Sequence, residues 1–237
     1  MIATIHQPEH LIWLGLIDKI SRADVFVILD TVQFRKNYYQ NRNKIRINAK
    51  EGWAWITVPT KKQPLKTKIE DIEISNIAWK EHYLALLEIN YFKAPYFETY
   101  YPEIKKIISK NHSKLSDLNI KLLLFLLSCF GLENKKIIKA SEINLPEVSG
   151  GSSVVFEICK TINANTYLSG SSGPDYLELE DFEKSGITIE VHNFKHPTYT
   201  QQYKPFIPCM SSIDLLFNHG PKSLEIITQN NIKSLSQ

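Results

Sequence analysis

Apolar residues recur with two different periods along the chain, and these periods predict strands and helices in alternation at its N-terminal end. Ile2–Ile5 is a short apolar run, residues 13–23 have apolar positions at helical spacing, and residues 24–30 form a continuous apolar run between two aspartates. A continuous apolar run suits a strand that is covered on both faces. Strand, helix and strand in this order indicate a βαβ unit.

The C-terminal part of the chain repeats this alternation. Apolar runs predict strands over residues 135–140, 166–169 and 187–191. Helical spacing predicts helices over residues 154–163, 177–185, 212–218 and 221–229.

The middle of the chain breaks the alternation. Residues 44–47 and 53–58 have period two on either side of a turn that contains Asn and Gly, which predicts a hairpin, and residues 69–74 alternate again. Helical spacing then covers residues 79–89, 101–109 and 115–130, and the last of these ends at Gly131, a favourable C-terminal cap.

These elements together predict an α/β fold. We expect a mainly parallel sheet with helices on both faces, an inserted antiparallel hairpin and a helical middle segment at about residues 78–131, all in a single domain of residues 1–237. Ligands of such sheets bind beyond the carboxyl ends of the strands. This rule brings residues 6–10, 30–42, 169–173 and 192–199 to one rim.

Charge and cysteine content narrow the class of protein. Lys and Arg number 28 against 25 for Asp and Glu, and this net charge of +3 is too small to indicate a nucleic-acid or membrane-surface binder. The three cysteines form no C-x-x-C motif, as expected for buried thiols of a cytoplasmic protein. The N-terminus lacks the basic region of a signal peptide, and the most apolar run, residues 122–130, is too short to cross a bilayer. The sequence therefore predicts a cytoplasmic protein without membrane insertion.

Arginines are concentrated in one part of the chain. Arg35, Arg42 and Arg46 lie close together, whereas lysines are spread over the whole sequence, and residues 34–50 contain no acid. Arginine is the side chain that grips a phosphate or carboxylate with two parallel hydrogen bonds. We therefore predict a phosphate or nucleotide site in which Arg35, Asn41, Arg42 and Asn43 contact substrate; a solvated hairpin face is the alternative.

Polar residues at two strand ends are further candidates. His6 and Gln7 follow the first strand, and Pro8 excludes the helix that would place His6 and His10 on one metal ion, so no metal site is predicted. Asp30, with Gln33 behind it, follows the second strand, where an acid could bind a ribose hydroxyl, an amine or Mg²⁺, or could cap a turn. We expect His6 and Asp30 to be catalytic and Gln7 and Gln33 to contact substrate.

Two later segments complete the candidate site. Ser169 and Gly170 open a loop rich in Ser and Gly, which invites close approach of a ligand and has the composition of a phosphate-cradling loop. His192 and His196 follow the last strand, and histidine is the side chain suited to acid–base chemistry near neutral pH. We select His196 as catalytic and Tyr199 as substrate-binding, and which of His6, His192 and His196 titrates is left open.

A series of short motifs extends over nearly the whole chain and resembles that of a known protein family. It runs through His6-Gln7-Pro8, Trp13-Leu14-Gly15, Asp18-Lys19-Ile20, Ala23–Val27, Asp30–Phe34, Asn41–Ile45, Lys93–Phe97, Ala164–Gly170, Pro197–Gln201 and Phe206–Asn218. In this order the motifs resemble the WbqC-like protein family over nearly the whole chain. The resemblance implies a role in bacterial surface polysaccharide synthesis, such as that of O-antigens. It further implies a transferase or amide-forming enzyme that adds an acyl or aminoacyl group, such as glycine, to a nucleotide-linked amino sugar.

The residues agree with this substrate class. A basic Arg/Asn segment suits the pyrophosphate of a nucleotide-sugar, and Tyr38, Tyr39, Trp53 and Trp55 could stack on a base or sugar. ATP and Mg²⁺ are expected if the acyl group has to be activated, with residues 169–173 as the phosphate loop; otherwise the sequence identifies no cofactor. A non-catalytic nucleotide-sugar-binding or scaffold protein of the same pathway and an RNA binder are the alternatives, and homo-oligomerisation is left open.

Overall fold

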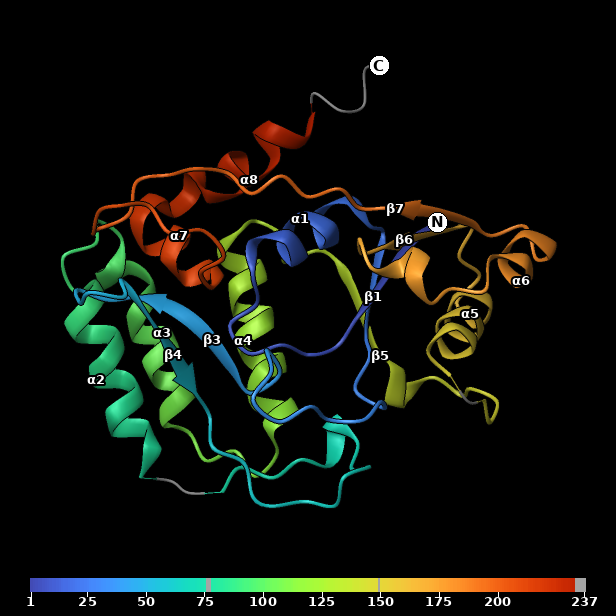
Figure 1. Ribbon diagram of the computed structural model, residues 1–237, viewed down its shortest axis with the longest axis horizontal. Coiled ribbons are helices and arrows are strands. Elements are labelled where there is room, and N and C mark those ends of the chain that lie inside the picture. The colour runs from blue at the N-terminus through green and yellow to red at the C-terminus, as the bar shows by residue number, and fades with distance from the viewer. Residues whose placement is uncertain (76–77, 149, 233–237) are drawn as a thin grey trace.

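The central feature of the molecule is a five-stranded parallel sheet (Figure 1). The computed structural model describes residues 1–75, 78–148 and 150–232. The strands lie in the order β5-β2-β1-β6-β7. Their bounds are β1 (Ile2–His6), β2 (Val25–Ile28), β5 (Lys136–Lys139), β6 (Thr166–Ser169) and β7 (Thr188–Val191). The predicted α/β fold is confirmed.

Both faces of the sheet are covered, as the continuous apolar runs require. All four residues of β2 are buried, with Phe26 and Ile28 in one core cluster and Val25 and Val27 in the other. Successive side chains of a strand point to opposite faces, so each core draws on alternate residues of the same strand.

Helices from distant parts of the sequence form the two outer layers (Figure 1). Residues of α1, α2, α3, α4, α7 and α8 belong to the larger core, and α5 and α6 pack on the other face of the sheet. The bounds are α1 (Leu14–Arg22), α2 (Trp79–Tyr91), α3 (Phe97–Ser109), α4 (Leu115–Cys129), α5 (Gly151–Thr161), α6 (Leu179–Lys184), α7 (Ser212–His219) and α8 (Ser223–Ile232). None of the helices in the described ranges has the length and apolar character needed to cross a membrane.

The predicted hairpin is present, and one predicted alternation is not a strand. Strands β3 (Arg42–Arg46) and β4 (Trp53–Thr57) pair antiparallel. Residues 69–74 instead contain the 3₁₀ helix η1 (Ile69–Asp71), followed by isolated bridges. Ile69 and Ile72 are both fully buried, because a single 3₁₀ turn brings residues three apart to the same side.

The order of the strands creates a switch point at the middle of the sheet. From β1 the chain passes through α1 to β2 on one side, and it later enters β6 on the other side of β1. In open α/β sheets the crevice beyond the carboxyl ends of two such strands is the usual ligand site. A ligand site is therefore expected beyond the carboxyl ends of β1 and β6.

Candidate functional site

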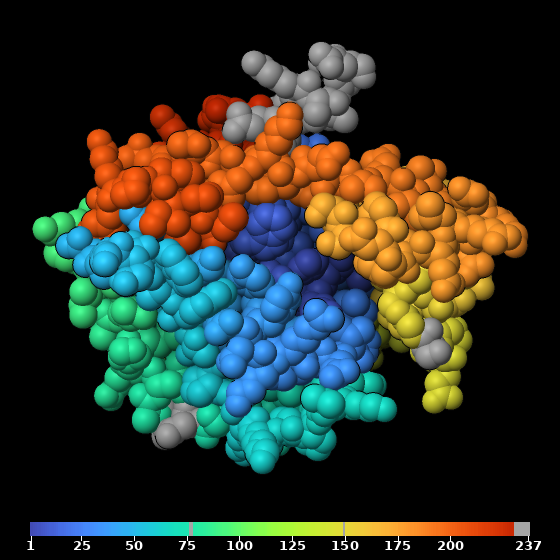
Figure 2. All heavy atoms as spheres, viewed as in Figure 1, coloured from blue at the N-terminus to red at the C-terminus, as the bar shows by residue number. Residues whose placement is uncertain are grey.

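A cavity of about 650 Å³ opens at this switch point. It is lined by residues that follow β1, β6 and β7, by one side of α1 and by residues 38 and 39. In Figure 2 the dark blue N-terminal residues lie in a hollow that is framed by the orange C-terminal segment and the lighter blue segment. The strand-end rule predicts four of the loop segments that line this cavity from the sequence, and the loop that contains Cys209 is a further one.

The cavity floor contains a buried lysine from α1. Lys19 has only 4% of its surface exposed, and its Nζ donates one long hydrogen bond, 3.4 Å, to the carbonyl oxygen of Ile5 at the end of β1. Burial lowers the pKa of Lys19 to about 8, and the negative charge of Glu9 partly opposes this shift. Within the described ranges no carboxylate lies close enough to form an ion pair with Lys19.

A histidine and a glutamate lie beside this lysine. His6, at the end of β1, has its Nε2 3.1 Å from Oε1 of Glu9. The other carboxylate oxygen of Glu9 is buried and has no hydrogen-bond partner among the residues that the structure describes. A ligand that presents an N–H or O–H group to Oε2 would satisfy this acceptor.

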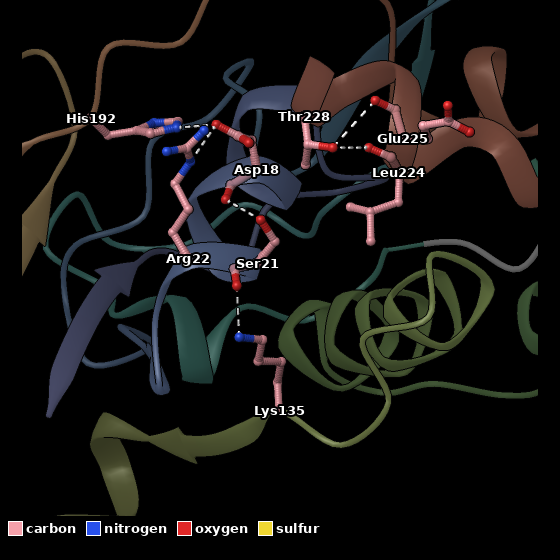
Figure 3. Close-up of polar contacts among 8 residues, drawn as sticks. All are labelled: Asp18, Ser21, Arg22, Lys135, His192, Leu224, Glu225 and Thr228. Atoms are coloured by element: carbon pink, nitrogen blue, oxygen red, sulfur yellow. Dashed lines mark hydrogen bonds and ion pairs between the residues drawn. The ribbon is translucent and has the colours of Figure 1, made fainter. Parts of the chain in front are cut away.

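A second histidine is held by a fully buried aspartate (Figure 3). Nε2 of His192, which follows β7, lies 2.6 Å from Oδ2 of Asp18, and the same oxygen accepts a 3.0 Å hydrogen bond from Nε of Arg22. Asp18 and Arg22 are one helical turn apart on α1, so the guanidinium fixes the carboxylate. The carboxylate in turn sets the His192 tautomer, with its proton on Nε2 and Nδ1 as the acceptor. No hydrogen bond to Nδ1 exists within the described part of the chain.

Aromatic rings and a tight turn form the walls. Trp13 packs edge-on against Phe194 at 5.4 Å and lies over Gly15, where a Cβ would come within 2.1 Å of the indole ring. Residues 170–173 turn back on themselves through a 2.9 Å hydrogen bond from Gly173 N–H to the carbonyl oxygen of Gly170. At Gly173 a Cβ would fall 1.8 Å from Oγ of Ser169, so only glycine permits this close approach.

Three of the residues that the sequence selects line the cavity, namely His6, Gly170 and His196. His196 has both ring nitrogens engaged, because Nδ1 donates to the carbonyl oxygen of Pro197 at 2.7 Å and Nε2 accepts from Cys209 N–H at 3.1 Å. Burial also lowers its pKa. His196 therefore stays neutral and holds the loop around Cys209 rather than offering a free nitrogen to a ligand.

The selected acid lies outside the cavity. Asp30 is 2% exposed, and its two oxygens accept hydrogen bonds from the backbone N–H and the hydroxyl of Ser141, at 3.0 and 2.7 Å. It thereby holds the start of the 3₁₀ helix η2 (Ala140–Glu142) after β5. This is the turn-capping role, one of the two roles open to it in the sequence.

The other selected residues also lie outside the cavity lining, and several of them serve the architecture. Nδ2 of Asn43 donates to the carbonyl oxygens of His10 and Leu11 at 3.0 and 2.8 Å, and Nδ2 of Asn41 donates to that of Val58 at 3.1 Å. Similar contacts occupy Gln7 with Gln40, Gln33 with Leu65, Ser169 with Gly170 and Tyr199 with Asp214, while Arg35 is exposed. Their role in substrate binding stays a prediction.

The arginine-rich strand reaches the cavity only through aromatic residues. The guanidinium of Arg42 lies 4.0 Å above the ring of Trp55, and Trp55 packs edge-on against Tyr39, which lines the cavity. Arg46 is instead buried under the hairpin, where its guanidinium donates to the carbonyl oxygens of Gly52, Tyr203 and Pro205.

The set of site residues predicted from the sequence omits those with the most unusual surroundings. Asp18, Lys19 and Glu9 are absent from it, and His192 enters only as an alternative. The available signal is the charged pair at positions 18 and 19, which stands between the apolar residues Ile17 and Ile20 of the predicted helix. Among the described residues no group of three or more His, Cys, Asp or Glu side chains is placed to hold a metal ion.

Comparisons with known proteins support the resemblance of the motifs. The model of the WbqC-like protein family matches residues 7–226. The uncharacterized protein Rv1507c of Mycobacterium tuberculosis is 30% identical over 222 residues, which cover 92% of this chain and 94% of that protein. None of the solved structures matches the chain. The family match spans α1, all of the cavity walls after β1 and the Asp18–His192 pair, and the chain belongs to the WbqC-like protein family.

Proposed function

We propose that this protein acylates the amine of a nucleotide-linked amino sugar that is destined for a bacterial surface polysaccharide. The polysaccharide context and the substrate class come from the family resemblance of the motifs. The cavity supports an enzyme of this kind, because it combines polar groups that can move protons with aromatic walls that suit a sugar or base. A nucleotide-sugar-binding protein without turnover is the alternative in the same pathway, and an assay of product formation distinguishes it from the enzyme.

The Asp18–His192 pair carries the proposal. An amine attacks an acyl carbon only when it is neutral, so a base has to take its proton as the bond forms. His192 presents Nδ1 as an acceptor while Asp18 holds Nε2 at 2.6 Å. The amine nitrogen bonds to the acyl carbon, the bond between that carbon and the donor's leaving group breaks, and the proton of the amine passes to Nδ1 of His192. The buried carboxylate then stabilises the imidazolium.

The remaining cavity residues are assigned to positioning. His6 with Glu9 is the second proton-handling pair, and it lies at the end of β1, which β6 separates from β7. Tyr38 and Tyr39 line the cavity on the side of the hairpin, where the nucleobase can stack. An acyl donor that arrives as a thioester needs nothing further. A free acid would in addition need ATP with Mg²⁺ for its activation.

Direct assay of product formation tests this function. The full chain is incubated with UDP- and dTDP-linked amino sugars, together with either acetyl-CoA or glycine with ATP and Mg²⁺, and acylated product is followed by mass spectrometry. We expect product with one donor, and we expect His192→Gln to lower the rate by about 100-fold or more. The exposed His82→Gln serves as the matched control and is expected to keep the full rate.

The outcomes separate three interpretations. A nucleotide-sugar that stabilises the protein against heat but yields no product with any donor would favour the binding or scaffold role. Loss of activity in His6→Gln with full activity in His192→Gln would move the base from His192 to His6. Equal rates for His192→Gln and the wild type, with intact folding, would rule out the Asp18–His192 pair as the catalytic base.

A further inference from the structure

The cavity is lined by a buried lysine for which the described residues provide no direct ion pair. Lys19 is almost fully buried, and the one hydrogen bond that it donates to the described residues, to the carbonyl oxygen of Ile5, is long at 3.4 Å. An ammonium group has three donors, so most of its hydrogen-bonding capacity is unused by the described residues. A buried charge without a partner is costly, and desolvated titratable groups in clefts are concentrated at functional sites.

A second set of donors lies at the neighbouring strand end. The turn of residues 170–173 lines the same cavity, and among the described residues no backbone acceptor is bound by the N–H groups of Ser171 and Ser172. This turn follows β6, which pairs directly with β1, and Thr4 of β1 donates to the carbonyl oxygen of Leu168 at 2.9 Å. Adjacent strands are about 4.8 Å apart. The Ile5 carbonyl that accepts the hydrogen bond of Lys19 therefore lies on the strand next to the one that leads into the turn.

We propose that Lys19 and the turn of residues 170–173 form an anion subsite that binds the phosphate groups of the substrate. The inference deepens the proposed function and rests on it only for the identity of the ligand, a nucleoside diphosphate bonded to a sugar. A compact ammonium together with free backbone N–H groups is the usual pairing for phosphate. The unpartnered Oε2 of Glu9 on the same floor then accepts a hydroxyl or amine hydrogen of the adjoining sugar.

This assignment places the phosphates differently from the sequence-based prediction. The arginine-rich segment was expected to grip the pyrophosphate, yet Asn41 and Asn43 bind carbonyl groups of the chain and Arg42 stacks on Trp55. Among the described residues that line the cavity, Lys19 is the one lysine or arginine. The two placements make opposite predictions for substitutions of these residues.

Binding of inorganic pyrophosphate, UDP and dTDP without Mg²⁺ tests the subsite by isothermal titration calorimetry. We expect Lys19→Met to weaken pyrophosphate binding by about 10- to 100-fold, the scale of a charged hydrogen bond. Lys19→Arg keeps a cation and is expected to retain part of the affinity. Lys62→Met, at an exposed lysine of a loop, is the matched control and is expected to bind as the wild type does.

Stability in the absence of ligand separates a ligand-binding lysine from a structural one. Methionine is similar in length to lysine and carries no charge, so Lys19→Met removes the uncompensated charge and is expected to raise the melting temperature of the free protein. Pyrophosphate should then no longer raise it further. A lysine that merely anchors β1 through the Ile5 carbonyl would show the reverse, with a lower melting temperature and unchanged pyrophosphate affinity, and this result would overturn the subsite.

The pH dependence provides a further readout. Binding needs the charged form of Lys19, so affinity is expected to fall as pH rises through about 8, its pKa in the free protein. Bound pyrophosphate raises the pKa of Lys19, so in the complex the loss of affinity occurs at a higher pH. Other titratable groups face the same cavity and also change the pyrophosphate affinity with pH, and this part of the pH dependence should remain in Lys19→Met. These groups are His6, Glu9, Tyr38, Tyr39, Tyr167, Tyr176, His192, His196 and Cys209, with Asp18 behind His192.

Failure of the subsite and failure of the proposed function are distinguishable, because no acyl donor is present in these titrations. Pyrophosphate binding that depends on Lys19 without any acylated product would leave the subsite in place and contradict the enzyme. Acylated product together with wild-type pyrophosphate affinity in Lys19→Met would contradict the subsite alone.

Discussion

The buried polar residues under the hairpin and those of the cavity floor are used in different ways. Under the hairpin, Asn43 and Arg46 use their side chains to bind backbone carbonyl groups from two distant segments and from the hairpin's own turn, although Nε of Arg46 has no partner among the described residues. On the floor, Lys19 makes one long hydrogen bond, and the described residues offer no partner to Oε2 of Glu9. Burial of polar groups alone therefore does not mark a functional site; unused hydrogen-bonding capacity inside a cavity does.

The energetic consequences of the two arrangements are opposite in sign. A buried polar group with partners contributes to stability, and its removal also leaves those partners unsatisfied. A buried charge without a partner lowers stability until a ligand arrives. Substitutions in the hairpin network should therefore reduce stability with little effect on ligand affinity, whereas substitutions on the floor should do the reverse.

The largest expected effect lies in the hairpin network. Arg46 is 1% exposed, and Arg46→Met removes its hydrogen bonds to the carbonyl oxygens of Gly52, Tyr203 and Pro205. We expect the free energy of unfolding in urea to fall by about 3–5 kcal/mol, because several buried acceptors lose their partner at once. Lys44→Met, in the same strand with its ammonium 4.4 Å from the ring of Trp53, should change it by less than about 1 kcal/mol. Equal losses in the two variants would contradict the structural role of Arg46.

Sequence periodicity predicts most of the fold because burial on both faces leaves a continuous apolar run. Residues 166–169 are predicted as a strand with the bounds that the structure has for β6. The prediction of an alternating segment at residues 69–74 is wrong for a physical reason. A 3₁₀ turn that buries Ile69 and Ile72 has nearly the same apolar positions as an alternating strand over so few residues. Helix α3 begins at Phe97 rather than near residue 101, and the stacking of Phe97 on Tyr101 at 4.4 Å extends it.

The site is less predictable than the fold. The strand-end rule finds the loops that meet at the cavity, because strand direction fixes where the carboxyl ends lie. Lys19 and Asp18 belong to a helix, and whether a helical residue faces a cavity depends on how the helix packs on the sheet. The spacing within the sequence does not encode that packing. Asn41 and Asn43 are as polar as any ligand-binding residue, yet their donors bind the chain itself.

A smaller effect is expected at the acid that follows β2. If Asp30 caps η2 through Ser141, Asp30→Ala should lower the free energy of unfolding by about 1–2 kcal/mol, as loss of a capping residue does. Asp30→Asn keeps an oxygen for the Ser141 N–H and should lower it by less. Turnover in the acylation assay should stay within about threefold of the wild type for both variants. A folded Asp30→Asn protein without activity would place Asp30 in the catalytic machinery after all.

The smallest expected effect is that of Arg42, and it decides between the two placements of the phosphates. Its guanidinium lies over Trp55, outside the cavity lining, and a partly exposed contact of this kind is worth about 0.5–1 kcal/mol. Arg42→Ala should therefore reduce pyrophosphate affinity by less than about threefold, through long-range attraction that salt screens. Titration at two salt concentrations, alongside Lys19→Met, measures this. A loss of tenfold or more in Arg42→Ala that persists at high salt would return the phosphates to the arginine-rich strand, since only direct contact survives screening.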